Sequence, residues 1–600
     1  MRVLRGVTGR SADRDVRSGA GLNGMSLPFQ DFGRARLRRG GMVLAVALWV
    51  LLFGSPLKKN MELSSEPDII NEDAQTLWHF FPFRDTALFP NDYIRDYYLR
   101  VYYPLGYRLT FALLAPLVDP SVLSKMLPYL LLGVTVASVA IASLRLGGLT
   151  SFFAAGVLCL SSEVFLDRMA GGLPRAFGFP VLAFALLGLA SGRVMFLVTA
   201  VLLGMAFYPW AAVAPGLALA FLLFIVPHQD RGSAREWSLR RRIFLLGSVT
   251  AVSVLLTLPM ALGGRAFGSR IAPSRVGEYP EAGPGGRYGP NDRPPFEKFL
   301  PEAIRHTVEA FGRYGPDDRP PFAKYGTRWK LFGVGLAALM GSGLLLLSFR
   351  DAAGRRVLAL AAAVVAGHTL ARALAPYLYL PERQLIYPIP VLALCLVPTS
   401  AFVLGGFLGG RMRSIGRPAA ALLVTGFCLA FFGAGVRAWT GLNIDVRHDK
   451  GVHSFLASLP KDVLVAGFPA PRGKIQEVPY FSRRRALIDF ESHQAHHTGY
   501  VEEMRRRMRA LIAAYFATEV APITRLHDEF GVTHLIIDRA DFGPKAPWYF
   551  EPFTPDIRRA HAAGREKGFA ALKLADLTVF SERDIFILDL RRLRRSGPDS

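Results

Sequence analysis

Apolar residues lie in long blocks along this chain rather than at regular single intervals. The first block is MVLAVALWVLLFGSPL, at 42–57. Blocks of this kind predict helices that cross a bilayer. The fold class that we expect is therefore a polytopic α-helical membrane protein with about eleven transmembrane helices. The later blocks, several of them short, lie at about 122–144, 149–162, 176–190, 193–208, 211–227, 243–262, 331–348, 357–378, 388–408 and 419–438.

Charge next to the blocks predicts their orientation. Residues 1–41 are long for the start of a signal peptide and no small-x-small cleavage site is obvious, which favours an uncleaved anchor. The arginines that end this segment place it in the cytoplasm. With eleven spans, the basic loops 229–242, 350–356 and 411–417 all fall on the same cytoplasmic side. Long outer segments are then expected at 58–121, 263–330 and 439–600. The predicted domains are a basic segment (1–41), a membrane domain (42–440) and an extracytoplasmic domain (441–600) in the inner, or plasma, membrane.

The C-terminal segment has a different pattern. DVLVAGF (462–468), RALIDF (485–490), THLIIDR (533–539) and DIFILDL (584–590) are apolar runs of strand length. Helix-period residues lie between them, at 500–516 and 520–531. Strands that alternate with helices predict a soluble α/β domain with a partly parallel sheet. A phosphate-binding glycine loop does not follow the first strand, so nucleotide binding is not indicated.

Composition supports the membrane class. Hydrophobic residues make up 51% of the chain, charged residues 20%, and the mean hydropathy is +0.28. These values exclude a fully soluble enzyme, a disordered chain and a fibrous protein. The net charge of +24 fits basic loops on anionic lipid, and no nucleic-acid-binding motif accompanies it. Three cysteines, all in apolar blocks, build neither a disulfide framework nor a Cys-rich metal site.

The first outer segment carries the candidate chemistry. Over 58–104 it has eight Asp or Glu residues against five Lys or Arg. Glu72 and Asp73 lie shortly after the first block. Carboxylates so close to a bilayer are energetically costly unless they are solvated, form ion pairs or serve a function. For these two residues we favour a functional role. Asp85, Asp92 and Asp96 are interleaved with aromatic residues, a composition that suits a sugar pocket. For these three we favour helix capping and ion pairs, with Arg84 and Arg95 as partners.

Four other patterns each leave two interpretations open. GRYGPNDRPPFEKF (286–299) recurs as GRYGPDDRPPFAKY (312–325), either as a duplicated extended loop, which we favour, or as a mobile lid. His493, His496 and His497 lack metal-site spacing, so packing is favoured over metal binding. His368 and Arg372 share a helix face toward either a polar cavity or, as we favour, a neighbouring helix. PLGYRLTFALLAPL (104–117) fits an interfacial helix better than a span.

The order of these segments resembles the GT-C superfamily of membrane glycosyltransferases, and most closely its protein O-mannosyltransferase and aminoarabinose transferase branch. The resemblance covers roughly residues 40–440. It comprises an anchor, an outer loop with adjacent acids, the helix at 104–117, and a span that ends in SLRLGG (143–148). SSEVFLDRMAGGLPRAFGFP (161–180) resembles the second outer loop of that group, and YLPERQLIYPIPVLALC (379–395) resembles its late loop and span. Some relatives carry Asp-Glu or Asp-x-Asp where this chain has Glu72-Asp73, which leaves the base open between these two residues.

The resemblance implies a lipid-linked-sugar glycosyltransferase, moving a hexosyl or pentosyl group on the outer face. Its partners would be a polyprenyl-phosphate-sugar donor, a glycan, lipid or protein acceptor, and membrane lipids, without nucleic acid. The chemistry needs a carboxylate base and cations beside the leaving phosphate. The base is assigned to Asp73, with Glu72 as runner-up and Asp167 as a further acid that positions acceptor or donor. Arg175 and Arg383 are the phosphate candidates, with snorkelling surface arginines as the alternative. The sequence indicates no cofactor, and it does not support a divalent metal.

Two other functions are compatible with the sequence. A transporter or flippase would show matched broken spans in two halves, and no such pairing is evident. A GT-C-like membrane assembly protein without catalysis would share every feature of the layout, because fold does not imply function.

Overall fold

The computed structural model describes residues 28–234, 237–283, 285–287, 299–311, 321–374, 381–408, 441–471 and 473–596. The side chains of Glu72, Asp73 and Ala74 lie outside this description, although their backbone lies within it. Most of the two repeat copies, the basic loop at 411–417 and the predicted span at 419–438 also fall outside it.

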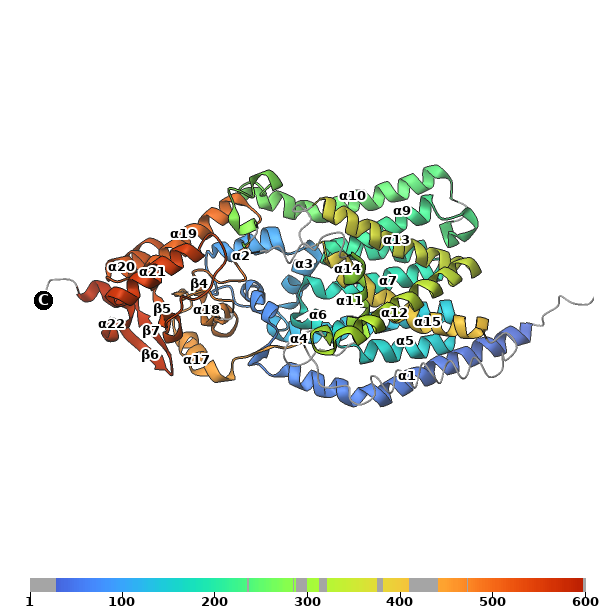
Figure 1. Cartoon of the computed structure of the whole chain (residues 1–600), viewed down its shortest axis with the longest axis horizontal. Helices are drawn as coiled ribbons and strands as arrows, with labels where there is room; N and C mark the ends of the chain where they lie inside the picture. Colours follow the sequence, from blue (N-terminus) through green and yellow to red (C-terminus); the bar gives the residue numbers. More distant parts are fainter. Residues whose placement is uncertain are drawn as a thin grey trace, which may run out of the picture.

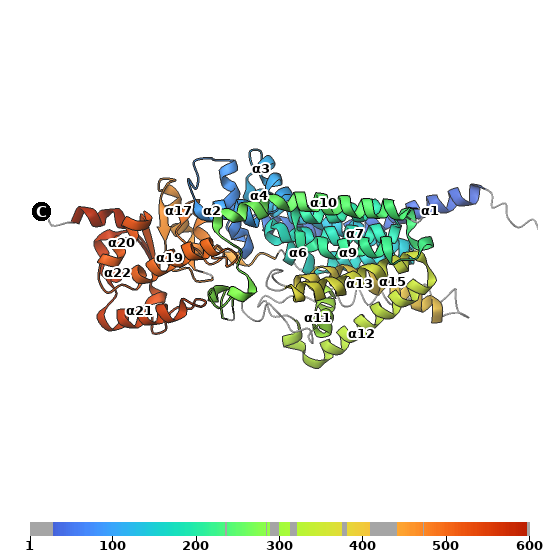
Figure 2. The same cartoon turned by 90° about the horizontal axis from the view of Figure 1, so that it is seen from above.

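A bundle of apolar helices forms one half of the molecule, and the C-terminal domain extends it along the same axis (Figures 1 and 2). Helices coincide with ten of the predicted blocks, and the eleventh block lies outside the described residues. The ten are α1 (Pro28–Ser65), α4 (Pro120–Gly147), α5 (Leu149–Ser161), α7 (Gly178–Ser191), α8 (Val194–Phe207), α9 (Pro209–Phe224), α10 (Leu239–Gly264), α12 (Pro321–Arg350), α13 (Ala352–Ala373) and α15 (Pro388–Leu408).

Length separates these helices into two groups. Among the described residues, seven helices are long and apolar enough to cross a membrane. An eighth candidate is α5 together with α6 (Glu163–Met169) and the turn after it, bent by 52°. With 14 and 16 residues, α8 and α9 extend only about 21 and 24 Å, less than the roughly 30 Å of a hydrocarbon core. The structure therefore supports seven or eight spans by length, and the expected count of eleven stays a prediction.

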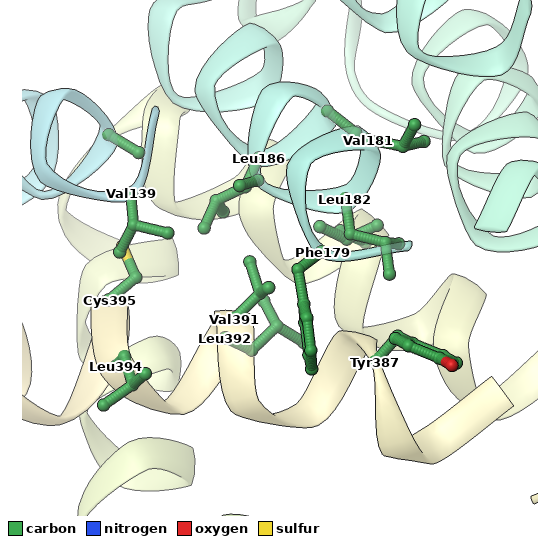
Figure 3. Close-up of a cluster of buried hydrophobic side chains, with 14 of the residues drawn as sticks. Val139, Phe179, Val181, Leu182, Leu186, Tyr387, Val391, Leu392, Leu394 and Cys395 are labelled. Carbon is green, nitrogen blue, oxygen red and sulfur yellow. The ribbon is translucent and has the colours of Figure 1, made fainter. Parts of the chain in front are cut away.

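The packing of the bundle fits a lipid environment. Figure 3 shows Phe179 and Leu186 of α7 next to Val391 of α15, in a layer of fully buried apolar side chains. Other helices turn large apolar groups outward: the side chains of Leu51 on α1 and Phe244 on α10 are 77% and 75% exposed. Such surfaces are costly in water and are favourable against lipid tails.

The basic loops at 229–242 and 350–356, where the structure describes them, lie at the end of the bundle that is farther from the C-terminal domain (Figure 1). Arg355 of α13 pairs with Asp230, with 2.6 Å between Nη2 and Oδ1. The guanidinium of Arg356 donates to the backbone carbonyls of Leu189 and Asp230. The loops at 229–242 and 350–356 therefore meet, as their assignment to one side of the membrane requires.

At the opposite end lie the short elements of the first outer segment (58–121), where outer denotes only the end of the bundle next to the C-terminal domain. They are β1 (Ile69–Ile70), η1 (Glu72–Phe83), α2 (Tyr93–Tyr97), η2 (Tyr98–Tyr102) and α3 (Leu105–Leu114). The predicted interfacial helix is α3, which packs on α8 so closely that a Cβ on Gly106 would lie 2.8 Å from the carbonyl oxygen of Ala206. Leu109 and Leu113 of the same helix are exposed.

The C-terminal segment contains a five-stranded mixed sheet of order β4-β3-β5-β7-β6. Parallel pairs join β3 to β4 and to β5, and antiparallel pairs join β7 to β5 and to β6. Four strands match the predicted runs, whereas β6 was not predicted because its residues carry no continuous apolar run. The elements are β2 (Ile444–Asp445), α17 (Lys450–Ser458), β3 (Leu464–Ala466), α18 (Lys474–Glu477), β4 (Arg485–Ala486), α19 (Thr498–Tyr515), α20 (Ala521–Phe530), β5 (His534–Asp538), α21 (Thr554–Lys567), α22 (Ala570–Lys573), β6 (Thr578–Glu582) and β7 (Ile585–Asp589).

One aromatic core joins the first outer segment to this C-terminal sheet and its helices. The rings of Tyr97 and Tyr500 stack at 3.7 Å between centroids, and those of Phe81 and Tyr480 lie 5.7 Å apart. Strand β1 also pairs antiparallel with β2, directly after residue 440. The C-terminal domain is therefore fixed to the loop that leaves α1, rather than suspended from its own linker.

Loss of this stacking should weaken the attachment of the domain. Tyr500 is fully buried and donates from its hydroxyl to the carbonyl of Ser492 at 2.7 Å. We expect Tyr500→Ala to cost about 3–5 kcal/mol, the usual range for removing a large buried aromatic. Thermal unfolding of the purified chain in detergent measures the loss. Trp548→Ala, at a ring that is 58% exposed, is the control, and equal loss in both variants would contradict the shared core.

Candidate functional site at the outer end of the bundle

The backbone next to Glu72 and Asp73 is fixed by a distant part of the chain. Asn71, just before η1, is buried, and its side-chain amide donates to the carbonyl oxygen of Gly441 at 2.7 Å. Glu72 and Asp73 begin η1, so their backbone lies directly beside this contact.

Asp167 lies on the other side of Gly441. A Cβ on Gly441 would lie 2.8 Å from Cα of Asp167, and the φ angle of Gly441 is +67°, so glycine suits this approach on both counts. The Asp167 side chain is 25% exposed, and one of its oxygens lies 3.7 Å from Nε of Arg168. The structure thus brings the predicted acid of the second outer loop next to the segment that carries the acid pair of the first.

A small cavity of about 10 Å³ lies between these segments. Asn71, Lys125, Tyr129 and Gly171 are among the residues that line it. This volume holds about one water molecule. A sugar bound here would therefore displace part of the wall.

The aromatic residues farther along the first outer segment do not line a sugar pocket. Phe80, Phe81, Tyr97 and Tyr98 are at most 1% exposed, because they form the core shared with the C-terminal domain. The sugar-pocket interpretation is wrong for these four rings, since their buried faces are not available to a sugar.

The three aspartates of that stretch are in caps and ion pairs, as favoured from the sequence, but the expected partners are not those found, since Arg84 and Arg95 donate to the carbonyls of Ala115 and His79. Asp85 pairs with Lys461 at 2.6 Å. Asp92 caps α2 by accepting from the backbone N–H of Arg95 at 2.9 Å, and Asp96 pairs with Arg100 at 2.7 Å.

Arg175 and Arg383 lie at the outer ends of two neighbouring helices. Arg175 belongs to η4 (Pro174–Phe177), just before α7, and Arg383 begins α14 (Arg383–Ile386), just before α15. Gly178 and Tyr387 bring the two ends together, since a Cβ on Gly178 would lie 2.7 Å from the Tyr387 ring. Nη1 of Arg383 donates to the Tyr208 hydroxyl at 3.1 Å.

Arginines outside the C-terminal domain place positive charge beside His496 of that domain. Burial lowers the pKa of His496 to about 3, and the charges of Arg270, Arg287 and Arg383 act in the same direction. The backbone around Arg270 pairs with that around His497, with Ile271 N–H donating to the His496 carbonyl at 3.0 Å. Burial disfavours charge of either sign at this imidazole, whereas the arginines add positive potential there.

His493 and His368 both pack within the protein. His493 is fully buried, shares a 3.1 Å hydrogen bond with the Tyr549 hydroxyl and contacts the ring of Phe550 at 4.9 Å. His368 shares a 3.2 Å hydrogen bond with the carbonyl of Pro381 and so holds the segment just before Arg383.

A cluster of charged residues at this end was not predicted. On α11 (Phe299–Phe311), Nδ1 of His306 lies 2.7 Å from Oε2 of Glu309. Arg305 pairs with Glu302 at 2.9 Å and also with Glu382, the residue before Arg383. The spacing of Glu302, His306 and Glu309, at i, i+4 and i+7, marks one helix face and was available in the sequence.

This cluster is connected to the second outer loop. The hydroxyl of Ser162 donates to the carbonyl of Ala310 at 2.8 Å. Burial would raise the pKa of Glu309, but His306, Arg305 and Arg168 lower it below its ordinary value. Because Arg168 also lies beside Asp167, charged groups extend across the outer end from Asp167 to Arg383.

Comparison with known proteins gives distant structural likeness only. No family model matches the chain, and no curated protein matches it in sequence. Among solved structures it is similar to the Archaeoglobus fulgidus oligosaccharyltransferase in complex with Zn and sulfate, at 11% identity and a TM-score of 0.43, over 79% of this chain and 65% of that one. The chain thus spans less than two thirds of that protein.

Two further solved structures are similar at the same level. The A. fulgidus oligosaccharyltransferase AglB, in complex with an inhibitory peptide and a dolichol-phosphate, matches 86% of this chain and 70% of its own at 10% identity, with a TM-score of 0.45. ArnT from Cupriavidus metallidurans, bound to undecaprenyl phosphate, matches 92% and 98% at 12% identity, with a TM-score of 0.47. At this distance the likeness assigns no activity, and function must be inferred from the residues of this chain.

The contact at Gly441 is testable by adding one methyl group. We expect Gly441→Ala to destabilise the protein by more than the roughly 1–2 kcal/mol that a left-handed backbone costs any other residue, because the new Cβ overlaps the backbone of Asp167. Gly531→Ala is the matched control, since Gly531 has a φ of +71° and open space around it. Thermal unfolding compares the two, and equal losses would refute the close approach.

Proposed function

We propose that this protein is a membrane glycosyltransferase that moves a sugar from a polyprenyl-phosphate donor to an acceptor at the outer end of its helical bundle. The observation that carries the proposal is the meeting of three segments at that end. The start of η1 and Asp167 are joined through Gly441, and Arg383 is joined to the same end through the charged groups around α11. Acids for proton transfer and cations for a phosphate are thus supplied together beside the membrane.

In the proposed reaction, the carboxylate of Asp73 takes the proton of an acceptor hydroxyl, with Glu72 as the runner-up. The acceptor oxygen forms a bond to the anomeric carbon of the sugar while the bond from that carbon to the phosphate oxygen breaks. The lipid phosphate leaves as an anion, and the anomeric centre is inverted. Asp167 positions the acceptor or the donor.

The leaving phosphate would be stabilised by Arg383 and Arg175. Arginine suits this task because its planar guanidinium binds phosphate through two parallel hydrogen bonds. The arginines beside His496 support an anion site here, since Arg270, Arg287 and Arg383 all contribute positive potential at that imidazole. Both helix ends lie where a lipid tail in the membrane and a headgroup outside it would meet.

Removal of the base tests the first part of this mechanism. We expect Asp73→Asn to lower transfer of labelled sugar from a polyprenyl-phosphate donor by about 10²–10⁴-fold, because the amide keeps the size of the side chain but accepts no proton. Asp85→Asn is the control, since Asp85 lies in the same loop in an ion pair with Lys461. Full activity in Asp73→Asn combined with a dead Glu72→Gln would exchange the two roles. Full activity in both would refute the first-loop site.

Arg383 should act on the donor rather than on the proton. If it holds the phosphate in both ground and transition states, Arg383→Ala will raise KM for the donor more than it lowers kcat. Arg275→Ala provides the control, because Arg275 is in a surface ion pair with Glu278. Donor binding without transfer in the unmodified protein would favour the non-catalytic alternative, and unchanged donor affinity in Arg383→Ala would identify a snorkelling arginine.

A further inference from the structure

The cluster on α11 has the composition and spacing of a metal site. Within the residues that the structure describes, Glu302, His306 and Glu382 are the one group of three His, Cys, Asp or Glu side chains whose ligand atoms all lie within 4.8 Å of one another. Nε2 of His306 lies 3.5 Å from Oε1 of Glu382 and 4.0 Å from Oε2 of Glu302. Ligands about 2.0–2.2 Å from a tetrahedral ion lie roughly 3.3–3.6 Å apart, so the Glu382 oxygen already lies at a suitable distance from the His306 nitrogen, and the Glu302 oxygen lies about half an ångström beyond it.

Glu309 holds the imidazole in the orientation that a metal ligand needs. Its Oε2 lies 2.7 Å from Nδ1 of His306, and that ring is 1% exposed. A carboxylate that accepts a hydrogen bond from Nδ1–H leaves Nε2 free to bind a metal, and metal-binding histidines are commonly oriented in this way. Nε2 is the ring atom that faces the two other carboxylates.

The charges of the cluster are not balanced within it. The carboxylates of Glu302, Glu309 and Glu382 share a single cation, Arg305. The nearby Arg168 lies beside another acid, Asp167. Oε2 of Glu302 is buried and accepts no well-aligned hydrogen bond from the described residues, although Nη2 of Arg305 lies 2.9 Å away. With a neutral histidine the cluster carries two excess negative charges, which a divalent cation would neutralise.

We propose that Glu302, His306 and Glu382 bind a divalent transition-metal ion of the Zn²⁺ class, with Glu309 as the positioning residue. One nitrogen and two carboxylate ligands suit Zn²⁺ better than Ca²⁺ or Mg²⁺, which prefer oxygen alone. Three protein ligands leave one coordination position for water or an anionic oxygen. The guanidinium of Arg305 now occupies part of the space between the carboxylates and would move outward.

Such an ion would join two segments of the chain. Two of its ligands lie on α11, and the third, Glu382, lies 76 or more residues farther along the sequence. Glu382 is covalently next to Arg383. The metal would therefore fix the start of α14, a consequence that bears on donor binding only if the proposed function holds. The binding of the ion itself does not depend on that function.

Metal titration of the full chain tests the site. The protein is purified in detergent, stripped with a chelator and titrated with Zn²⁺ by calorimetry, with metal content measured after desalting. We expect one ion per chain at this site, lost in His306→Gln and Glu382→Gln, and bound about 10–100-fold more weakly in Glu309→Gln. His448→Gln, at an exposed histidine, is the control and should bind as the unmodified protein does.

Arg305→Met separates a metal site from a network of ion pairs, even if the ligand variants fold poorly. Removing the competing guanidinium should tighten Zn²⁺ binding and enlarge the rise in unfolding temperature that Zn²⁺ causes. No binding in the unmodified protein, equal binding in His306→Gln, or no tightening in Arg305→Met would each overturn the proposal. Loss of glycosyl transfer in Asp73→Asn would leave these results unchanged, so the two proposals fail independently.

Discussion

The aromatic core between the first outer segment and the C-terminal domain is the interaction on which the outer half of the protein depends. Tyr97 and Tyr500 stack within it, and the ion pair between Arg483 and Asp119, at 2.7 Å, supports its edge. Large buried rings dominate the energetics of such contacts. Because the domain rests on the loop that leaves α1, the positions of His496 and of the strand after Gly441 follow from that loop.

The same core divides the acids of the first outer segment into two groups. The distal aspartates are used to cap α2 or to pair with lysine and arginine, because the rings between them are buried against the C-terminal domain. Glu72 and Asp73 precede that core, next to the contact between Asn71 and Gly441. They are thus placed where the membrane bundle and the outer domain meet, and near Asp167 rather than near the distal aspartates.

Local patterns in the sequence predict the elements well and their long-range partners poorly. The apolar blocks and four of the five strands of the C-terminal sheet follow from hydrophobic runs, a property of neighbouring residues. Burial of Tyr97 and Phe81 does not follow, since their partners Tyr500 and Tyr480 are about 400 residues away and their composition equally suits a sugar pocket. The charged face of α11 could be predicted from the spacing i, i+4 and i+7 in the sequence. The contribution of Glu382 to the same cluster could not, because the position of Glu382 depends on how α13 and α15 place the segment between them.

The segment around Arg383 gives a physical reason to prefer a functional arginine over a snorkelling one. Four consecutive residues are each held by a different element: the carbonyl of Pro381 by His368 of α13, Glu382 by Arg305 of α11, Arg383 by the Tyr208 hydroxyl, and Gln384 by the Trp210 carbonyl of α9. Each such hydrogen bond contributes only about 0.5–1.5 kcal/mol net, and ordering the backbone of each residue costs about 1–2 kcal/mol. A snorkelling arginine needs only a flexible stem at the membrane surface and no defined backbone. Contacts from several helices that fix one cation in place are instead what a site requires when the position of a charge determines how well it binds.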